Sequence, residues 1–94
     1  MTKAELIAEI IKSTGLKRSD VHLIVESICH LIKEAVIEGQ SVYIRGFGTF
    51  TVKKRAKKMA RNISKNTAMI IEERSVPTFK ASKLFAAKVK RNLQ

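Results

Sequence analysis

Residues 42–52 read Val-Tyr-Ile-Arg-Gly-Phe-Gly-Thr-Phe-Thr-Val, and this stretch decides the fold. Val42 and Ile44 are separated by one residue, Tyr43, which gives the period of two that a strand requires. The glycine-rich residues 46–48 then form a turn signal, and the extended pattern resumes over residues 49–52. The stretch therefore predicts two neighbouring strands that are joined by a tight turn.

Helical periodicity precedes this stretch. Thr2 can cap a first helix, Glu5 completes a capping box, and Gly15 is placed to end the helix in a left-handed turn. A second helix is predicted to begin at residues 18–19 and to stop at Gly39. Its apolar stripe consists of Val21, Ile24, Val25, Ile28, Leu31, Ile32, Ala35 and Val36.

A basic segment follows the two strands. Residues 53–65 contain seven basic side chains and no acidic ones, and a strand pattern returns over residues 67–71. Asn66 lies between these extended runs, and asparagine tolerates the positive φ of a tight hairpin turn. A hairpin with this charge has no apolar face to pack on the body, so we expect a projecting β-arm over residues 53–74. Ser82 is then expected to cap a last helix.

These elements predict an α+β fold in one domain that spans residues 1–94. Residues 1–40 are expected to form a helical part, and residues 41–94 a three-stranded antiparallel sheet, a long protruding β-hairpin arm and a short C-terminal helix. The chain has four phenylalanines and one tyrosine, and so small a core is often completed by a second copy. The expected aromatic residues of the core and dimer interface are Phe47, Phe50 and Phe79.

The net charge of +11 is unevenly distributed along the chain. Residues 1–40 hold five basic and six acidic side chains, whereas residues 41–94 hold fourteen basic and two acidic ones. A basic tract confined to one region is the usual footprint of a polyanionic partner. The sequence therefore predicts that the second part of the chain binds a polyanion.

Catalytic and metal-binding functions are not favoured by the sequence. One cysteine excludes an internal disulfide and a cysteine-rich zinc cluster, and Cys29, beside the apolar stripe, is expected to be buried. His22, Glu26 and His30 share one helical face, but such a set is more often a polar face than a metal site. We find no nucleophile–base pair and no phosphate-binding glycine loop, so we expect no enzyme, no cofactor and no small-molecule substrate.

The compartment is also suggested by the sequence. No apolar run approaches the length that spans a bilayer, and no apolar segment of a signal peptide stands at the start. We therefore expect a cytoplasmic protein with no membrane partner.

Three motifs together resemble the bacterial HU/IHF family. They are Gly46-Phe47-Gly48-Thr49-Phe50, Arg61-Asn62 and Val76-Pro77-Thr78-Phe79-Lys80-Ala81, and the similarity extends over essentially the whole chain without gaps. HU and IHF are themselves among the known minor-groove architectural proteins. The resemblance implies an intertwined dimer, of identical or paralogous subunits, in which residues 1–40 are the helical dimerisation part. The two β-arms of this dimer would enter the minor groove and wrap and bend double-stranded DNA. It also implies a role in organising the nucleoid.

The sequence departs from the family pattern at the tip of the arm. The family usually has Arg-Asn-Pro there, and the proline wedges between base pairs, whereas this chain has Ile63. Isoleucine can also act as a wedge, although it keeps an N–H group and lacks the fixed φ of proline. Asn66 and Ser82 stand where glycine is common, and the Ser82 hydroxyl can cap the last helix or bind a phosphate.

The expected DNA-binding residues are mainly the cations of the arm, together with Lys80 and Lys83, which flank the cap of the last helix. Strand alternation places only part of the arm set on the DNA-facing side. Arg61 and Asn62 could reach minor-groove acceptors, where readout distinguishes mainly A·T from G·C. The expected set is Lys3, Lys53, Arg55, Lys57, Lys58, Arg61, Asn62, Ile63, Lys65, Arg74, Lys80, Ser82 and Lys83, with Lys54 as a further arm cation.

Other functions are less favoured by the same residues. One is a sequence-specific, IHF-like or transcriptional regulator that reads the major groove through a helix-turn-helix around Gly15. Phosphate would repel the acidic and polar face of its second helix, which carries Asp20, His22, Glu26, Ser27, His30 and Glu34. A membrane-surface protein would need an apolar face that the basic segment lacks. The absence of aromatic residues from the arm argues against single-stranded nucleic acid, whereas RNA stays open.

Overall fold

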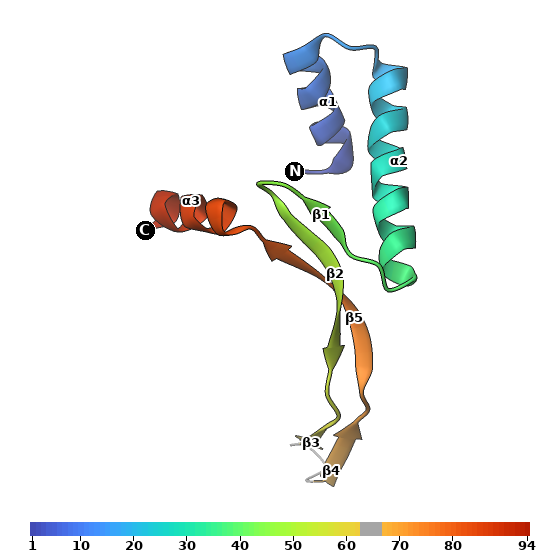
Figure 1. Cartoon of the computed structure of the whole chain (residues 1–94), viewed down its shortest axis with the longest axis vertical. Coiled ribbons are helices and arrows are strands. Elements are labelled where there is room, and N and C mark those ends of the chain that lie inside the picture. The colour runs from blue at the N-terminus through green and yellow to red at the C-terminus, as the bar shows by residue number, and fades with distance from the viewer. Residues whose placement is uncertain (63–66) are drawn as a thin grey trace. The chain divides into compact units, whose positions relative to one another are not determined.

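Figure 1 shows the computed structural model of the chain, which describes residues 1–62 and 67–94. For residues 58–62 and 67–71 it describes the backbone only. The chain divides into two units, residues 1–34 and residues 35–94. The predicted arm turn at Asn66 lies outside the described residues.

The first unit contains α1 (Lys3–Thr14) and most of α2 (Arg18–Ile37). The Oγ1 atom of Thr2 accepts the backbone N–H of Glu5 at 3.2 Å. Gly15 adopts φ 72° and donates its N–H to a carbonyl of the last turn at 2.8 Å. Both predicted ends of the first helix are therefore confirmed.

Only one side of the α2 apolar stripe is covered within the first unit. Val21 is 2 % exposed and Ile7 of α1 is 3 % exposed, while Val25 and Ile32 are half-buried. Successive residues of a helix are about 100° apart, so the covered residues of α2 occupy one side of the stripe. The exposed side carries Ile24, Ile28 and Leu31. This unit therefore presents an apolar surface that its own residues leave open to solvent.

Cys29 is exposed in the chain, so the prediction that it is buried is wrong. It lies about 80° around the helix from Val21, at the edge of the covered side. The packing that buries Val21 does not extend that far around α2.

The second unit begins with the end of α2. Gly39 has φ 81° and donates its N–H to Val36, and the N–H of Gln40 reaches the carbonyl of Ala35 at 2.8 Å. This pair of hydrogen bonds is a Schellman motif, which requires a left-handed residue at the position of Gly39. The predicted helix stop is confirmed.

A three-stranded antiparallel sheet follows, in the order β1-β2-β5. Its strands are β1 (Val42–Ile44), β2 (Gly48–Arg55) and β5 (Arg74–Ala81). The turn between β1 and β2 closes when Phe47 donates its N–H to the carbonyl of the last β1 residue at 3.0 Å. Gly46 supplies the positive φ, 78°, that this turn needs. The predicted sheet is therefore confirmed.

The arm differs from the single hairpin that the sequence predicts. Beyond the β2–β5 ladder, β3 (Lys58–Asn62) pairs with β4 (Thr67–Ile71), but residues 56–57 and 72–73 are not in strands. Two residues separate the ladders on each side, so the register continues without a slip. The interrupting residues are Ala-Lys and Glu-Glu, types that strands disfavour.

The second unit contains a cluster of aromatic rings, of which Phe47 and Phe79 are 42 % and 38 % exposed in the single chain. The Phe79 ring centroid lies 4.8 Å from that of Phe50 and 5.0 Å from that of Phe47. Phe85, from α3 (Lys83–Leu93), stacks on Phe47 at 5.5 Å with 15° between the ring planes. The predicted aromatic core therefore also includes a residue of the last helix.

Gly48 is the point at which this cluster meets the sheet. A Cβ atom at this position would lie 2.4 Å from the carbonyl oxygen of Lys80 and 2.6 Å from the ring of Phe79. Both distances are far below van der Waals contact, so only glycine lets β5 and the Phe79 ring come this close to β2.

Candidate nucleic-acid interface

The register of the sheet sorts the basic residues of β2 and β5 onto one face. Residues that lie directly opposite in an antiparallel pair share a face, and the faces alternate along each strand. Lys53 pairs with Val76, Arg55 with Arg74 and Thr49 with Lys80. The four cations Lys53, Arg55, Arg74 and Lys80 therefore share one face, which we call the basic face, and all four are exposed.

The other residues of the basic face are mainly small and polar. Thr51 lies opposite Thr78, and its hydroxyl is 2.7 Å from that of Ser41. The face therefore combines cations and hydroxyl groups, both of which donate hydrogen bonds to phosphate oxygens.

Arg55 and Lys57 reach the interruption of the arm together with Arg74. These three residues and Ala56 line one open hollow. The structure thus brings three of the sequence-predicted cations together at the point where the β2–β5 ladder ends.

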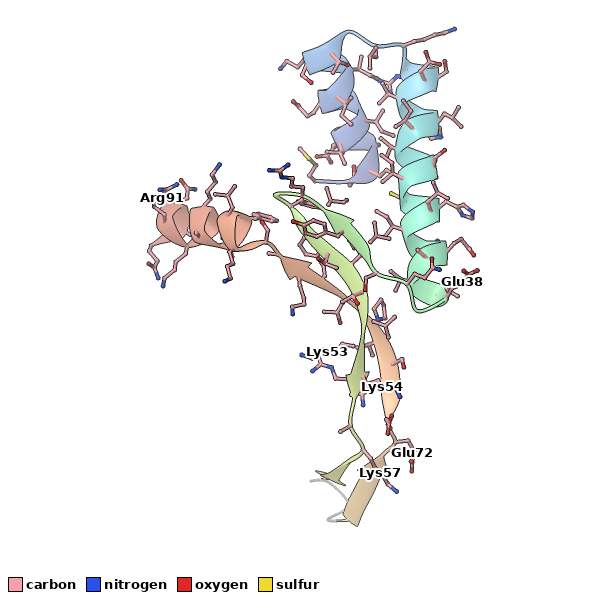
Figure 2. The ribbon with its side chains drawn as sticks, in the orientation of Figure 1. Glu38, Lys53, Lys54, Lys57, Glu72 and Arg91 are labelled. Atoms are coloured by element: carbon pink, nitrogen blue, oxygen red, sulfur yellow. The ribbon has the colours of Figure 1, made fainter. Side chains whose placement is uncertain are left out.

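Lys54 lies on the opposite face from these cations. Its partner in the register is Ser75, and its Nζ atom is 3.4 Å from Oε1 of Glu73. Lys53 and Lys54 are consecutive on β2, in the stretch that leads to the break in the arm (Figure 2). The structure therefore separates one arm cation from the others, as strand alternation predicts.

Two exposed residues were missed in the sequence, Tyr43 on the basic face and Arg45 in the turn that follows β1. Tyr43 of β1 lies opposite Thr49, which places it in the same row as Lys80. Arg45 follows in the β1–β2 turn and is exposed. The alternation of Tyr43 and Arg45 with Val42 and Ile44 is the sequence signal that could have identified them, whereas charge density alone points to the arm.

Ser82 joins α3 to the sheet. Its hydroxyl accepts the N–H of Phe85 at 3.1 Å, and its own N–H donates to the carbonyl of Phe47 at 2.9 Å. Of the two roles that the sequence suggests for this hydroxyl, the structure shows the cap. Lys80 and Lys83 flank the cap and are exposed.

Lys3 lies in the first unit and forms an ion pair with Glu26 of α2. The hydrogen bond and the charge of Glu26 raise the pKa of Lys3, and the same hydrogen bond and the charge of Lys3 lower the pKa of Glu26. A phosphate would have to compete with this carboxylate for Lys3. Glu26 is therefore engaged with a cation within the chain.

The remaining predicted residues belong to the arm tip. Lys58, Arg61 and Asn62 occupy register positions on β3, opposite Ile71, Ala68 and Thr67. Ile63 and Lys65 lie outside the described residues.

Residues 1–62 and 67–94 show neither a cluster of metal ligands nor a membrane-spanning helix. In that part of the chain, no group of three or more histidine, cysteine or acidic side chains could hold a metal ion. Within the same residues, no helix is both long and apolar enough to cross a membrane.

Comparisons with known proteins agree with this fold. A family model described as bacterial DNA-binding protein matches residues 1–90. The DNA-binding protein HU of Thermotoga maritima is 43% identical over 90 residues, covering 96% of this chain and 100% of that protein. Integration host factor subunit alpha of Caulobacter vibrioides is 34% identical, covering 99% of this chain and 93% of that subunit.

A solved structure is also similar. A cocrystal structure of Anabaena HU with DNA superposes with a TM-score of 0.84 at 32% identity, covering 95% of this chain and 97% of that one. The fold and the basic face thus define a small bacterial DNA-binding protein. The chain belongs to the bacterial DNA-binding protein family, which includes HU and the IHF subunits.

Proposed function

We propose that the protein is a dimeric architectural protein that binds, bends and wraps double-stranded DNA through the basic face and the β-arm. The observation that carries this proposal is the gathering of Lys53, Arg55, Arg74 and Lys80 on one face of the sheet. Arg55 and Arg74 lie directly opposite each other, an arrangement of like charges that is unfavourable without a counterion. A polyanion on this face supplies that counterion.

The chemistry of the basic face favours phosphate contacts over base contacts. Lysine, arginine and threonine bind phosphate oxygens without regard to sequence, and the minor groove offers little more than a distinction between A·T and G·C. We therefore propose weak or moderate sequence preference. A sequence-specific, IHF-like regulator is the second candidate, and it is less favoured because phosphate and minor-groove contacts carry little sequence information.

A dimer is proposed because large apolar surfaces remain open in the single chain. Ile28 is 49 % exposed on α2, and Phe47 and Phe79 of the aromatic cluster are 42 % and 38 % exposed. Exposed apolar patches of this kind mark surfaces that another subunit covers. A symmetric dimer, or a dimer with a paralogue, would carry two basic faces and two arms.

The arm tip is proposed to enter the minor groove. Lys58, Arg61, Asn62 and Lys65 would contact the backbone and the groove, and Ile63 would wedge between base pairs in place of the usual proline. Replacing Ile63 with alanine should then lower the bend angle more than the affinity, as measured by energy transfer between the ends of a labelled duplex. An unchanged angle would exclude the wedge.

Such a role needs no catalytic group and no cofactor. A protein that organises chromosomal DNA works in the cytoplasm at the nucleoid, and we propose that location.

Lys53 and Lys54 offer a matched test of the basic face. They are neighbours of the same type, but they lie on opposite faces of β2. Binding to straight, nicked and bent duplexes should be measured over a range of salt concentrations for Lys53→Gln and Lys54→Gln. The slope of log K against log salt is negative, and each phosphate that is no longer neutralised makes it less steep by about 0.9. Lys53→Gln should therefore flatten the slope, and Lys54→Gln should leave it unchanged.

Two results would count against the proposal. Equal slopes for both variants and the wild type would mean that the basic face does not hold phosphate. Equal affinity of the wild type for bent and straight duplexes would remove the bending role, because a protein that bends DNA binds pre-bent DNA more tightly.

A further inference from the structure

Tyr43 is the aromatic residue of the basic face. The chain has one tyrosine and four phenylalanines, and all four phenylalanines contact one another in the aromatic cluster. Tyr43 instead lies on β1 opposite Thr49, in the row that continues to Lys80 on β5. It is 68 % exposed in the single chain. A large ring therefore stands open to solvent among the hydroxyl groups and cations of the basic face.

The proposed dimer surfaces leave Tyr43 open. They consist of the exposed side of the α2 stripe and of the aromatic cluster, and Phe50 and Phe79 pair on the face of the sheet opposite to Tyr43. Val42 shares that opposite face with Phe50 and is half-buried. Because the faces alternate along a strand, a subunit that covers Val42 and Phe50 leaves the ring of Tyr43 on the other side.

The neighbours of Tyr43 determine which partner can cover it. Arg45 follows two residues further along the chain and is exposed, and exposed Lys80 ends the row that starts at Tyr43. A partner that covers the ring must therefore also meet two cations, which favours a polyanion over an apolar protein surface. The DNA backbone combines both properties, since a deoxyribose with apolar C–H groups lies between successive phosphates.

The row is wide enough for a short segment of one DNA strand. Tyr43 on β1 and Lys80 on β5 are separated by two strand spacings, about 10 Å. Each nucleotide of one DNA strand advances about 3.4 Å along the duplex axis, so about three nucleotides cover this distance. A strand that crosses the row with a phosphate at Lys80 therefore brings a sugar near Tyr43.

We infer that Tyr43 binds the sugar–phosphate backbone of the duplex: its ring packs on a deoxyribose and its hydroxyl donates a hydrogen bond to a phosphate oxygen. Tyrosine is among the side chains that bind phosphate and sugar in protein–DNA complexes, and its rigid ring loses little conformational entropy. The contact is electrically neutral and releases no counterion, so it adds affinity that salt does not screen. This inference rests on the proposed function and deepens it, because it assigns a salt-independent contact to a face whose cations supply the salt-dependent part.

An unpaired base is the other ligand that an exposed tyrosine ring could bind, by stacking. The composition of the basic face argues against it. Proteins that stack bases place several aromatic side chains among their basic residues, whereas the basic face has a single one. One ring beside cations suits one sugar of a continuous backbone.

The test uses the full chain and separates the hydroxyl group from the ring. Tyr43→Phe removes the hydroxyl alone, and Tyr43→Thr removes the ring with a residue that favours strands. Lys80→Gln is the matched charged variant, because Lys80 lies in the same row. Leu23→Gln is the control, because it removes an exposed apolar side chain from α2 in the first unit. Urea unfolding should first show that each variant is folded.

Binding to an intact duplex should then be measured against salt. Tyr43→Phe should bind about fivefold more weakly than the wild type, the usual effect of one neutral hydrogen bond, and Tyr43→Thr about tenfold more weakly. Both should keep the wild-type slope of log K against log salt, because neither removes a charge. Lys80→Gln should make that slope less steep by about 0.9 for each phosphate that it no longer neutralises. Leu23→Gln should match the wild type.

The wild-type side chain can also be followed directly. Tyr43 is the single tyrosine of the chain, so protein labelled with 3-fluorotyrosine gives one fluorine resonance, from this residue. The difference in its chemical shift between H2O and D2O reports contact with solvent. This difference should be large in the free protein and mostly lost when the duplex binds; a difference that the duplex leaves unchanged would overturn the inference.

Three results of the binding experiment would also overturn the inference while the proposed function stands. They are wild-type affinity of Tyr43→Thr for the intact duplex, a loss confined to single-stranded DNA, which would mean base stacking, and wild-type affinity of Tyr43→Phe, which would remove the hydrogen bond to phosphate. The proposed function itself fails if Lys53→Gln and Lys80→Gln both keep the wild-type slope, whatever the variants of Tyr43 do.

Discussion

Arg55 and Arg74 lie directly opposite each other at the last pair of the β2–β5 ladder. Like charges at directly opposed positions destabilise an antiparallel pair, whereas the same two guanidinium groups form a site for phosphate. The free protein therefore carries a local cost at the base of the arm, which a phosphate bound between the two guanidinium groups would remove.

Replacing Arg74 with threonine should separate these two effects. Threonine suits a strand and removes the repulsion, so the free energy of unfolding at low salt should rise by about 0.2–1 kcal/mol. The slope of log K for DNA binding against log salt should become less steep by about 0.9 for each phosphate that Arg74 neutralises in the wild type. Urea unfolding and salt-dependent titration measure the two quantities. Ser75→Thr, one position along on the opposite face, is the control: it should leave DNA binding unchanged and should reproduce only the part of the stability gain that comes from the strand propensity of threonine. Lower stability of Arg74→Thr with unchanged DNA binding would contradict the proposed repulsion and the proposed phosphate contact.

Gly48→Ala should destabilise the fold because the added methyl group meets two obstacles. One is the flexible ring of Phe79, but the other is the backbone carbonyl of Lys80 at 2.4 Å. Overpacking of this kind costs about 1–3 kcal/mol, which denaturant unfolding can measure. Adding Phe79→Leu should not restore the stability, since the carbonyl stays in place. Full rescue by the smaller side chain would show that the ring is the obstacle.

Local signals in the sequence were sufficient to predict where the helices end and how the first two strands of the sheet pair. Thr2, Gly15, Gly39 and Ser82 act through their own backbone geometry or through hydrogen bonds to residues a few positions away, so each can be recognised without knowledge of the tertiary fold. The pairing of β1 with β2 follows in the same way from the short turn at Gly46.

Features that depend on distant residues were not predictable. The break in the arm lies at Ala-Lys on one side and Glu-Glu on the other, and the sequence does not show that these two distant pairs lie opposite each other. The ion pair of Lys3 with Glu26 joins two helices. The exposure of Cys29 depends on how much of α2 the first helix covers. The apolar periodicity of α2 does not reveal how wide that covered area is.

Ile28→Lys should convert the proposed dimer to a monomer. Ile28 lies on the open side of the α2 apolar stripe and is 49 % exposed in the single chain. A lysine there would place an unpaired charge in the subunit interface. Leu23→Lys is the control, because Leu23 is 64 % exposed and lies about 140° around the helix from Ile28. Sedimentation equilibrium should give the dimer mass for the control and half that mass for Ile28→Lys; a dimer in both would place the interface elsewhere.

The ion pair between Lys3 and Glu26 should make stability depend on pH at both ends of the scale. Because Lys3 lowers the pKa of Glu26 below 4.5, the stabilisation is present above that value and is lost as the pH falls through the lowered pKa. Because Glu26 raises the pKa of Lys3 above 10.5, the stabilisation is present below that value and is lost as the pH rises through the raised pKa.

Lys3→Gln should therefore lower stability between about pH 4.5 and 10.5 and match the wild type in strong acid, where Glu26 is protonated. The effect should be small and should shrink with added salt, because both side chains are about half exposed. Urea unfolding across pH should be measured for the wild type, Lys3→Gln, Glu26→Gln and the double variant. This double-mutant cycle isolates the coupling free energy between the two side chains. A coupling that persists in acid would mean that the two residues interact through packing and not through charge.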